Sequence, residues 1–224
     1  MSVIGDPLLN SLLTVLHARS DAQTAAMAAF ELEGASHPLD VDTIKAFRSD
    51  KFVALDRDKA EFCYQLCRAT NVRRAVEVGT SYGVSTLYLA AAVRDNVKGT
   101  ADKGVVIGTE YEPAKAVAAK AHFAQAGLGD YIDLREGDLR ETLKDVPGPI
   151  DFVLMDVWVR MARPALELLF PHLRLGAVVV CDNTQTRRAD YADYFSFLND
   201  QANGFKTMTL PFSGGLELSV RCGS

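Results

Sequence analysis

Apolar positions along the chain alternate between short continuous runs, typical of buried strands, and the three-to-four-residue spacing typical of helices. The first clear strand covers residues 72–78, where apolar residues surround one acidic position, Glu77. A glycine turn follows, and an apolar run with helical spacing begins at Val84. Further strands are predicted over 104–109, 132–135, 150–155 and 177–181, and further helices over 113–126 and 163–173.

This order of strands and helices predicts an α/β fold with a doubly wound, mostly parallel Rossmann-like sheet. The C-terminal pattern differs from the rest. Residues 206–211 and 216–221 flank Ser213-Gly214-Gly215 and predict an antiparallel hairpin. The sheet is therefore expected to be parallel over most of its width and to end in an antiparallel pair.

The region before the first strand is expected to be helical. Residues 7–30 and 56–69 carry helical patterns, and a loop is expected over 31–39. We find no convincing domain boundary, so a single domain over residues 1–224 is expected.

Composition and charge narrow the function classes. The net charge is −5, and no run of lysines or arginines stands out, which argues against a nucleic-acid partner. No apolar stretch approaches the ~20 residues of a membrane span, and the four cysteines form no Cys-x-x-Cys pair. We expect a cytoplasmic protein that acts on a small molecule and contacts neither nucleic acid nor membrane.

The turn after the first strand has the spacing Glu77-x-Gly79-x-x-x-Gly83. It differs from the Gly-x-Gly-x-x-Gly turn that places a pyrophosphate at a helix N-terminus. An acidic residue two positions before the first glycine is a poor neighbour for a phosphate and a good one for an ammonium group. The glycines are expected to let a ligand approach the backbone closely.

The segment Glu77-Val-Gly79-Thr-Ser81-Tyr-Gly83-Val-Ser85 resembles the first motif of class I S-adenosylmethionine-dependent methyltransferases. Within that class it is most similar to the small cation-dependent O-methyltransferases of the catechol and caffeoyl-CoA type. The resemblance extends from about residue 50 to the end and implies the seven-stranded methyltransferase fold. It also implies that residues 1–50 cover the active site or form a dimer contact, and a homodimer is expected. The cofactor-binding residues that it implies are Glu77, Gly79, Ser81, Gly83, Ser85, Glu110, Asp138, Asp156 and Trp158.

Three of these positions have alternatives. Glu110 matches the acidic residue that binds the ribose hydroxyls, and Glu112 is its close rival. Asp138 would accept a hydrogen bond from the adenine amino group, but it is equally well placed to cap a helix over residues 139–144. Trp158 would lie beside the adenine, or simply pack in the core.

The resemblance also implies a metal site. Asp156 follows the strand over 150–155, and Asp182 and Asn183 follow the strand over 177–181. These three match the divalent-metal ligands of the O-methyltransferases, and two carboxylates with one amide oxygen suit Mg²⁺. The ion would hold the acceptor hydroxyl and lower its pKa, which gives Asp156 a catalytic role. The alternative is that Asp156 only contacts the cofactor and that Asp182 and Asn183 only end a strand.

The sequence departs from the family pattern at Val159, where the family usually has a lysine that acts as general base. The adjacent Arg160 stays protonated, so it would stabilise an anionic substrate without accepting its proton. Three explanations stay open: the metal alone acidifies the hydroxyl, the substrate has a lower pKa and needs no base, or the metal site is vestigial and another nucleophile is methylated.

The function expected is methyl transfer from S-adenosylmethionine to an oxygen of a catechol- or phenol-like acceptor, with a divalent cation orienting the hydroxyl. A metal-independent methyltransferase shares every cofactor-binding residue and is one alternative. A nicotinamide oxidoreductase, disfavoured by the glycine spacing, and a non-catalytic nucleotide-binding protein are the others.

Overall fold

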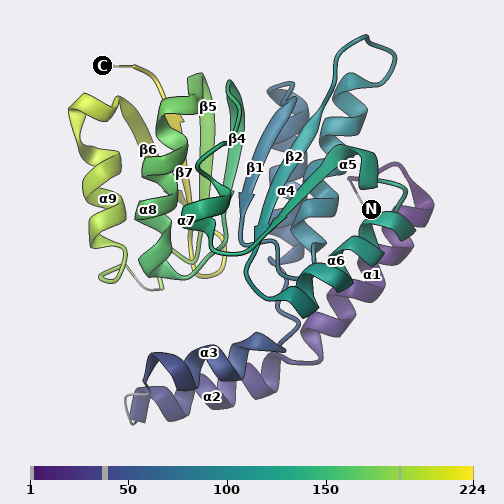
Figure 1. The fold of residues 1–224 in the computed structure, drawn as a ribbon. Helices are drawn as coiled ribbons and strands as arrows, with labels where there is room; N and C mark the ends of the chain where they lie inside the picture. Colours follow the sequence, from purple (N-terminus) through teal and green to yellow (C-terminus); the bar gives the residue numbers. More distant parts are fainter. Residues whose placement is uncertain (1–2, 37–39, 187, 224) are drawn as a thin grey trace.

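The computed structural model describes residues 3–36, 40–186 and 188–223. Its centre is a seven-stranded sheet with the order β3-β2-β1-β4-β5-β7-β6 (Figure 1). The strands are β1 (Arg74–Val78), β2 (Val105–Glu110), β3 (Ile132–Glu136), β4 (Ile150–Met155), β5 (Leu173–Asp182), β6 (Phe205–Leu210) and β7 (Leu216–Arg221). Neighbours from β3 to β5 pair in parallel, whereas β7 pairs antiparallel with both β5 and β6. The prediction of a mostly parallel, doubly wound sheet that ends in an antiparallel hairpin is confirmed.

Helices cover both faces of this sheet. They are α1 (Pro7–Asp21), α2 (Thr24–Ser36), α3 (Val41–Ser49), α4 (Arg57–Ala69), α5 (Val84–Val97), α6 (Pro113–Gln125), α7 (Leu139–Thr142), α8 (Val159–Leu169) and α9 (Ala192–Asn199), with 3-10 turns η1 (Gly129–Tyr131), η2 (Phe170–His172) and η3 (Gln201–Asn203). One apolar core joins α1, α4, α5 and α6 to one face, and a second joins α7, α8 and α9 to the other. Because α1 and α4 also pack on α5, this helix is buried around most of its circumference, which explains its unbroken apolar run.

The N-terminal region departs from the sequence-based prediction. The single helix expected over residues 7–30 is two helices, because α1 ends at Asp21 and α2 begins at Thr24. The loop expected over residues 31–39 is wrong for its first part, since α2 continues through Ser36, and residues 37–39 lie outside the described ranges. Strong helix formers in α2 outweigh the single Gly34, and α3 was not expected at all.

The helices α2 and α3 form a pair that projects beyond the end of the sheet where β1 and β4 finish (Figure 1). Phe30 and Phe47 stack between the two helices with their ring centroids 3.8 Å apart. The pair is tied to the rest of the protein at the end of α3, where Lys115 Nζ donates to the Arg48 carbonyl at 3.0 Å. This pair is placed beside the carboxyl ends of the central strands.

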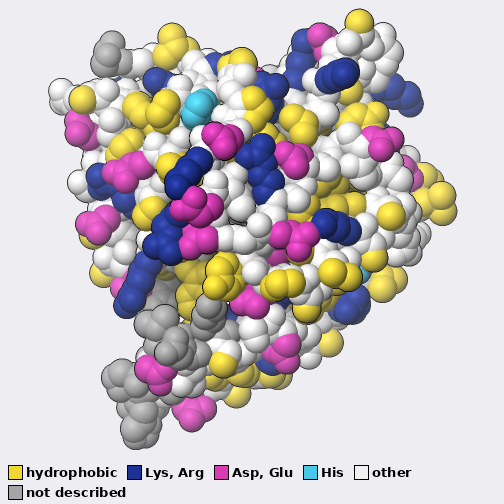
Figure 2. Space-filling view, viewed as in Figure 1, with side chains coloured by type: hydrophobic (Ala, Val, Ile, Leu, Met, Phe, Trp, Pro, Cys, Tyr) yellow, Lys and Arg dark blue, Asp and Glu magenta, His cyan; other side chains and the backbone are white. Residues whose placement is uncertain are grey.

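Charged side chains of both signs are interspersed over the face shown in Figure 2. The view gives no extended basic surface, in keeping with the net charge of −5. Within the described ranges, no helix combines the length and the apolar character needed to span a bilayer.

Candidate functional site

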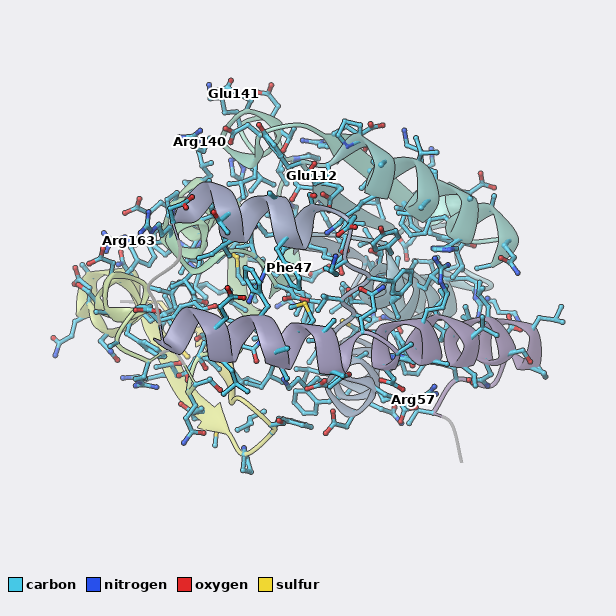
Figure 3. All side chains as sticks on the ribbon, turned by 90° about the horizontal axis from the view of Figure 1, so that it is seen from below. Phe47, Arg57, Glu112, Arg140, Glu141 and Arg163 are labelled. Atoms are coloured by element: carbon cyan, nitrogen blue, oxygen red, sulfur yellow. The ribbon has the colours of Figure 1, made fainter. Side chains whose placement is uncertain are left out.

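The carboxyl ends of β1 and β4 lie side by side at the point where the strand order reverses. Open α/β sheets bind ligands at such a switch point, in the crevice outside the carboxyl ends of the strands. The Asp156 amide donates to the Val78 carbonyl at 3.0 Å, so the two strands stay paired up to their last residues. Figure 3 views this edge of the sheet from below, with α2 and α3 crossing in front of it.

Gly79 and Gly83 give the turn between β1 and α5 its shape. Gly79 has φ +99°, and a Cβ there would collide with the Asp156 carbonyl oxygen. Gly83 has φ +81°, and a Cβ there would collide with the Phe123 ring. The structure thus supplies a reason for both glycines other than the ligand approach inferred from the sequence: a left-handed backbone pressed against protein atoms.

Glu77 is fully buried at the end of β1. Its Oε2 accepts hydrogen bonds from Thr80 Oγ1 at 3.0 Å and from the Thr86 hydroxyl. Its Oε1 has no hydrogen-bond partner among the residues that the structure describes. Burial raises the pKa of Glu77 to about 7, although the hydroxyls of Ser85, Thr86 and Thr80 act to lower it. A buried carboxyl with an open acceptor oxygen suits a cationic or N–H-bearing group of a ligand.

Glu110 ends β2 and fixes the glycine turn beside it. Its Oε2 accepts from the Ser81 amide at 2.6 Å, and its Oε1 accepts from the Glu112 amide at 2.8 Å. Ser81 itself has φ +51°, a left-handed conformation held by this contact. Glu112 occupies the N-cap position of α6 without a capping bond from its side chain. The structure brings Glu110, and not the Glu112 carboxylate, to the turn.

Asp138 follows β3 and caps α7. Its Oδ1 accepts from the Arg140 amide at 2.9 Å, and its carboxylate also pairs with the Arg140 guanidinium. The hydrogen bond from the Arg140 side chain, and to a smaller extent the one from the Arg140 amide, lowers the pKa of Asp138 to about 2. The Gly137 amide donates to the Glu110 carbonyl at 2.9 Å, which places Asp138 next to the end of β2. The capping role is confirmed, and the role toward adenine stays a prediction.

Trp158 stands at the N-cap position of α8 and is 43% exposed, which excludes simple core packing. The Arg48 guanidinium lies 5.6 Å from the centre of its ring, so α3 reaches this side of the site. The helix α8 begins at Val159, four residues before the predicted start at 163. Val159 packs on the apolar core, and Arg160 is exposed on the first turn of α8. Neither side chain offers a base at this position.

A lysine that the sequence-based prediction missed lies at the acidic end of the site. Lys59 belongs to α4, and its side chain is 1% exposed. Its Nζ lies 2.8 Å from Asp182 Oδ1 and 2.9 Å from Asp56 Oδ2. The other oxygen of Asp182 accepts from Asn183 Nδ2 at 2.8 Å. The Asp182 carboxylate therefore holds an ammonium on one side and an amide on the other.

The sequence does contain a signal for Lys59. It lies four and eight residues before Cys63 and Cys67, so all three share one face of α4. Both thiols are buried, and burial raises their pKa well above the usual range. A lysine in line with two buried positions is itself predicted to be buried, and a buried ammonium needs an anionic partner.

The acidic side chains around Lys59 shift one another's pKa. Burial raises the pKa of Asp156, and the charges of Asp182 and Glu77 raise it further. Burial also raises the pKa of Asp182, but the hydrogen bond and charge of Lys59 oppose this. Burial alone would lower the pKa of Lys59, yet Asp182 and Asp56 outweigh it and raise that pKa. Burial therefore favours the protonated form of Asp156, whereas at Asp182 the Lys59 ammonium opposes the effect of burial.

These contacts do not fit a divalent ion held by Asp156, Asp182 and Asn183. Both Asp182 oxygens already accept hydrogen bonds, and Asn183 directs its amide nitrogen toward Asp182. An ammonium 2.8 Å from Asp182 would repel a cation on the same carboxylate. Within the described ranges, no group of three or more His, Cys, Asp or Glu side chains is arranged to hold a metal. This geometry therefore does not favour Asp156, Asp182 and Asn183 as ligands of a divalent ion.

Comparison with known proteins identifies relatives of the chain. Residues 76–184 match a family described as a methyltransferase domain. A catechol O-methyltransferase of Mycobacterium tuberculosis is 30% identical over 132 residues, which cover 58% of this chain and 57% of that protein. A caffeoyl-CoA O-methyltransferase of Petroselinum crispum is 26% identical over 182 residues, which cover 74% of this chain and 71% of that protein. The chain spans about half the length of the first curated relatives it matches, 57% of one and 51% of another.

Solved structures share the fold. An O-methyltransferase of Bacillus cereus in complex with SAH has a TM-score of 0.69 at 18% identity, covering 98% of this chain and 92% of that one. The O-methyltransferase TomG of Streptomyces achromogenes, in complex with SAM, has a TM-score of 0.65 at 21% identity, covering 87% of this chain and 96% of that one. At these identities the likeness shows the fold, a seven-stranded methyltransferase sheet.

Proposed function

Because the chain carries a methyltransferase domain and is related to the catechol and caffeoyl-CoA O-methyltransferases, we propose that it transfers a methyl group from S-adenosylmethionine to a small-molecule oxygen. The observation that carries the proposal is the buried Glu77 carboxyl at the switch point, whose Oε1 has no hydrogen-bond partner in the described part of the chain. An open, buried acceptor at this edge matches the ammonium of the cofactor's methionine part.

The other side chains at this edge suit the rest of the cofactor. Glu110 would accept hydrogen bonds from ribose hydroxyls, since each of its oxygens keeps a second lone pair beside the backbone bond it already accepts. Asp138, next to the end of β2, would accept from the adenine amino group, and the exposed Trp158 ring would pack against the base. Ser81, Gly79 and Gly83 hold the turn that these groups share.

S-adenosylmethionine supplies a methyl group that its sulfonium already activates. The chain's own task is therefore to hold the acceptor oxygen in line with that methyl group and to exclude water. As methyl transfers, the acceptor hydroxyl must lose its proton, and Val159 cannot accept it. We propose a phenol- or catechol-like acceptor whose hydroxyl is acidic enough to ionise without a lysine base.

We further propose that the transfer proceeds without a divalent cation, which is the metal-independent alternative. The support is the contact between Lys59 and Asp182, because the carboxylate that the ion would need already holds an ammonium. The exposed Arg160 would then attract an anionic acceptor to the site without touching the proton.

The test is turnover in the presence of EDTA. Protein stripped of metal is incubated with S-adenosylmethionine and a panel of phenols and catechols, and mass spectrometry detects methylated products and S-adenosylhomocysteine. We expect the same turnover with and without EDTA. Turnover that stops in EDTA and returns with Mg²⁺ would overturn the metal-free proposal. Cofactor binding without turnover on any acceptor would favour the non-catalytic alternative.

A further inference from the structure

The buried ion pair between α4 and the end of β5 lies where the metal site was expected. Lys59 is 1% exposed, and Asp182 is 6% exposed. A pair so shielded from water persists only with good geometry and further hydrogen bonds, and both are present here. The ammonium donates to Asp182 and Asp56, and Asn183 satisfies the other Asp182 oxygen.

We propose that the Lys59 ammonium is the built-in cation of this site: it takes the place of a divalent metal among the strand-end carboxylates, and its removal uncovers a metal-binding site. The functional consequence of this proposal rests on the proposed methyl transfer, whereas the metal-binding consequence does not.

The surroundings of the ammonium are acidic on several sides. Asp182 and Asp56 touch it, and Asp156 interacts electrostatically with Lys59 and with both of these carboxyls. Glu77, on β1, adds a fourth acidic group that acts on Asp156. Carboxylate oxygens are the ligands that Mg²⁺ and Mn²⁺ prefer. The described side chains do not form a ready metal site, but Asp182 and Asp56 lie 2.8 and 2.9 Å from the ammonium, so a cation that replaced it would meet both carboxylates.

The ammonium and a divalent ion exclude each other. A metal ion bound to Asp182 would lie within a few ångströms of Nζ, where two positive charges repel strongly. The Lys59 stem lies on the buried face of α4 together with Cys63, and two carboxylates hold its ammonium.

The cluster remains reachable from outside. The Asp56 side chain is 55% exposed and lines a hollow of about 240 Å³ between α1, α2 and the start of α4. An ion from solution therefore has a route to Asp56 and, once the lysine is removed, to Asp182.

The exchange of metal for lysine changes what the acceptor must offer. A metal ion holds two vicinal oxygens in neighbouring coordination positions. The Lys59 ammonium already gives two of its three N–H groups to Asp182 and Asp56, so it cannot hold such a pair. The site therefore does not select a vicinal diol, and one ionised hydroxyl is sufficient.

Mn²⁺ titration tests the proposal without any acceptor. Bound Mn²⁺ is measured by electron paramagnetic resonance on the EDTA-stripped full chain, for the native protein, Lys59→Met and Lys59→Arg. Lys120→Met is the matched control, since Lys120 pairs with Glu136 at the surface of the protein. We expect the native protein, Lys59→Arg and the control to bind more weakly than about 1 mM, the weak end of carboxylate sites. Lys59→Met should bind one ion per chain at least about tenfold more tightly, because repulsion by one nearby positive charge weakens cation binding by more than that factor.

A double variant, Lys59→Met with Asp182→Asn, should lose the Mn²⁺ affinity that Lys59→Met gains. Stoichiometric Mn²⁺ binding to the native protein would overturn the proposal, and this outcome does not depend on how any variant folds. A folded Lys59→Met without a gain would also overturn it. Binding of S-adenosylhomocysteine, measured on the same samples, reports separately on the proposed function: its absence would contradict methyl transfer and leave the metal result standing.

Discussion

Among single residues, Glu110 links two parts of the site, the glycine turn and the start of α6. Its two oxygens hold the Ser81 and Glu112 amides, so one carboxylate orders the glycine turn and the start of the next helix. Its rival Glu112 makes no capping bond from its side chain. The two acids therefore make different contacts, although they are only two residues apart in the sequence.

Glu110→Ala should weaken S-adenosylhomocysteine binding by about 1.5–3 kcal/mol, the loss of hydrogen bonds to a charged group. Glu112→Ala is the matched control and should change the affinity little. Isothermal titration calorimetry measures both. A larger loss in Glu112→Ala than in Glu110→Ala would move the ribose role to Glu112.

Glu77 should make stability depend on pH. Burial raises its pKa to about 7 in the folded protein, above the ordinary glutamate value of 4.5. Between pH 4.5 and pH 7 the folded state therefore binds more protons than the unfolded state. The stability that protonated Glu77 contributes is fully present below about pH 4.5 and is lost as the pH rises through 7.

Urea unfolding at pH 5 and pH 8 measures this effect on the native protein and Glu77→Gln. The variant should lose up to about 3 kcal/mol of the pH-dependent difference, from the size of the shift. An identical difference in both proteins would show that Glu77 titrates normally.

Individual site residues were predictable from the sequence where they belong to a recognised motif. Glu77, Glu110 and Asp156 all lie at carboxyl ends of strands, as the spacing predicts. Lys59 was missed because its partner Asp182 is 123 positions away along the chain. Only packing of α4 against the sheet reveals that pairing.

The turn between β1 and α5 is the element on which the site depends. It combines three positive-φ residues, Gly79, Ser81 and Gly83, with close packing on Asp156 and Phe123. The glycines were predictable from spacing, but the neighbours that require them were not: Asp156 directly follows β4, and Phe123 belongs to α6.

Gly79→Ala should lower the free energy of unfolding by more than Gly99→Ala. Both glycines have positive φ, which makes alanine unfavourable by about 1–2 kcal/mol. Only at Gly79 would the new Cβ also collide with backbone, whereas open space surrounds Gly99. Urea unfolding of both variants gives the comparison, and equal losses would contradict the packing described for the turn.

Errors in element boundaries have a common physical cause. The helix α2 runs through Gly34 because strong helix formers surround it. The helix α8 starts at Val159 although its N-cap residue, Trp158, makes no side-chain capping bond. In both cases the local sequence gives a weak stop or start signal, and tertiary packing sets the boundary.

Over the whole molecule, the alternating pattern predicted the sheet, because parallel strands must be covered on both faces by helices. The placement of α2 and α3 was not predictable, since contacts at the end of α3 join Arg48 to Lys115 and Trp158, which are far away along the chain. We propose that residues 1–224 form one domain and that this N-terminal pair covers the site or forms a homodimer contact.

Analytical ultracentrifugation should give twice the mass of the chain. Leu32, on α2, is 71% exposed, and its burial between two copies would stabilise the dimer. Leu32→Asp should shift the protein toward monomer, and Val117→Asp, at a 68% exposed position of α6, is the control. A native monomer at all concentrations would contradict this arrangement.

The most direct test of the proposed function is calorimetric titration of S-adenosylhomocysteine into the EDTA-stripped protein. We expect one molecule bound per chain, with an affinity that added Mg²⁺ leaves unchanged, because we propose that Glu77 and Glu110 hold the ligand and that Lys59 excludes the metal. No binding would contradict the methyltransferase assignment, and binding that appears only with Mg²⁺ would contradict the role of Lys59.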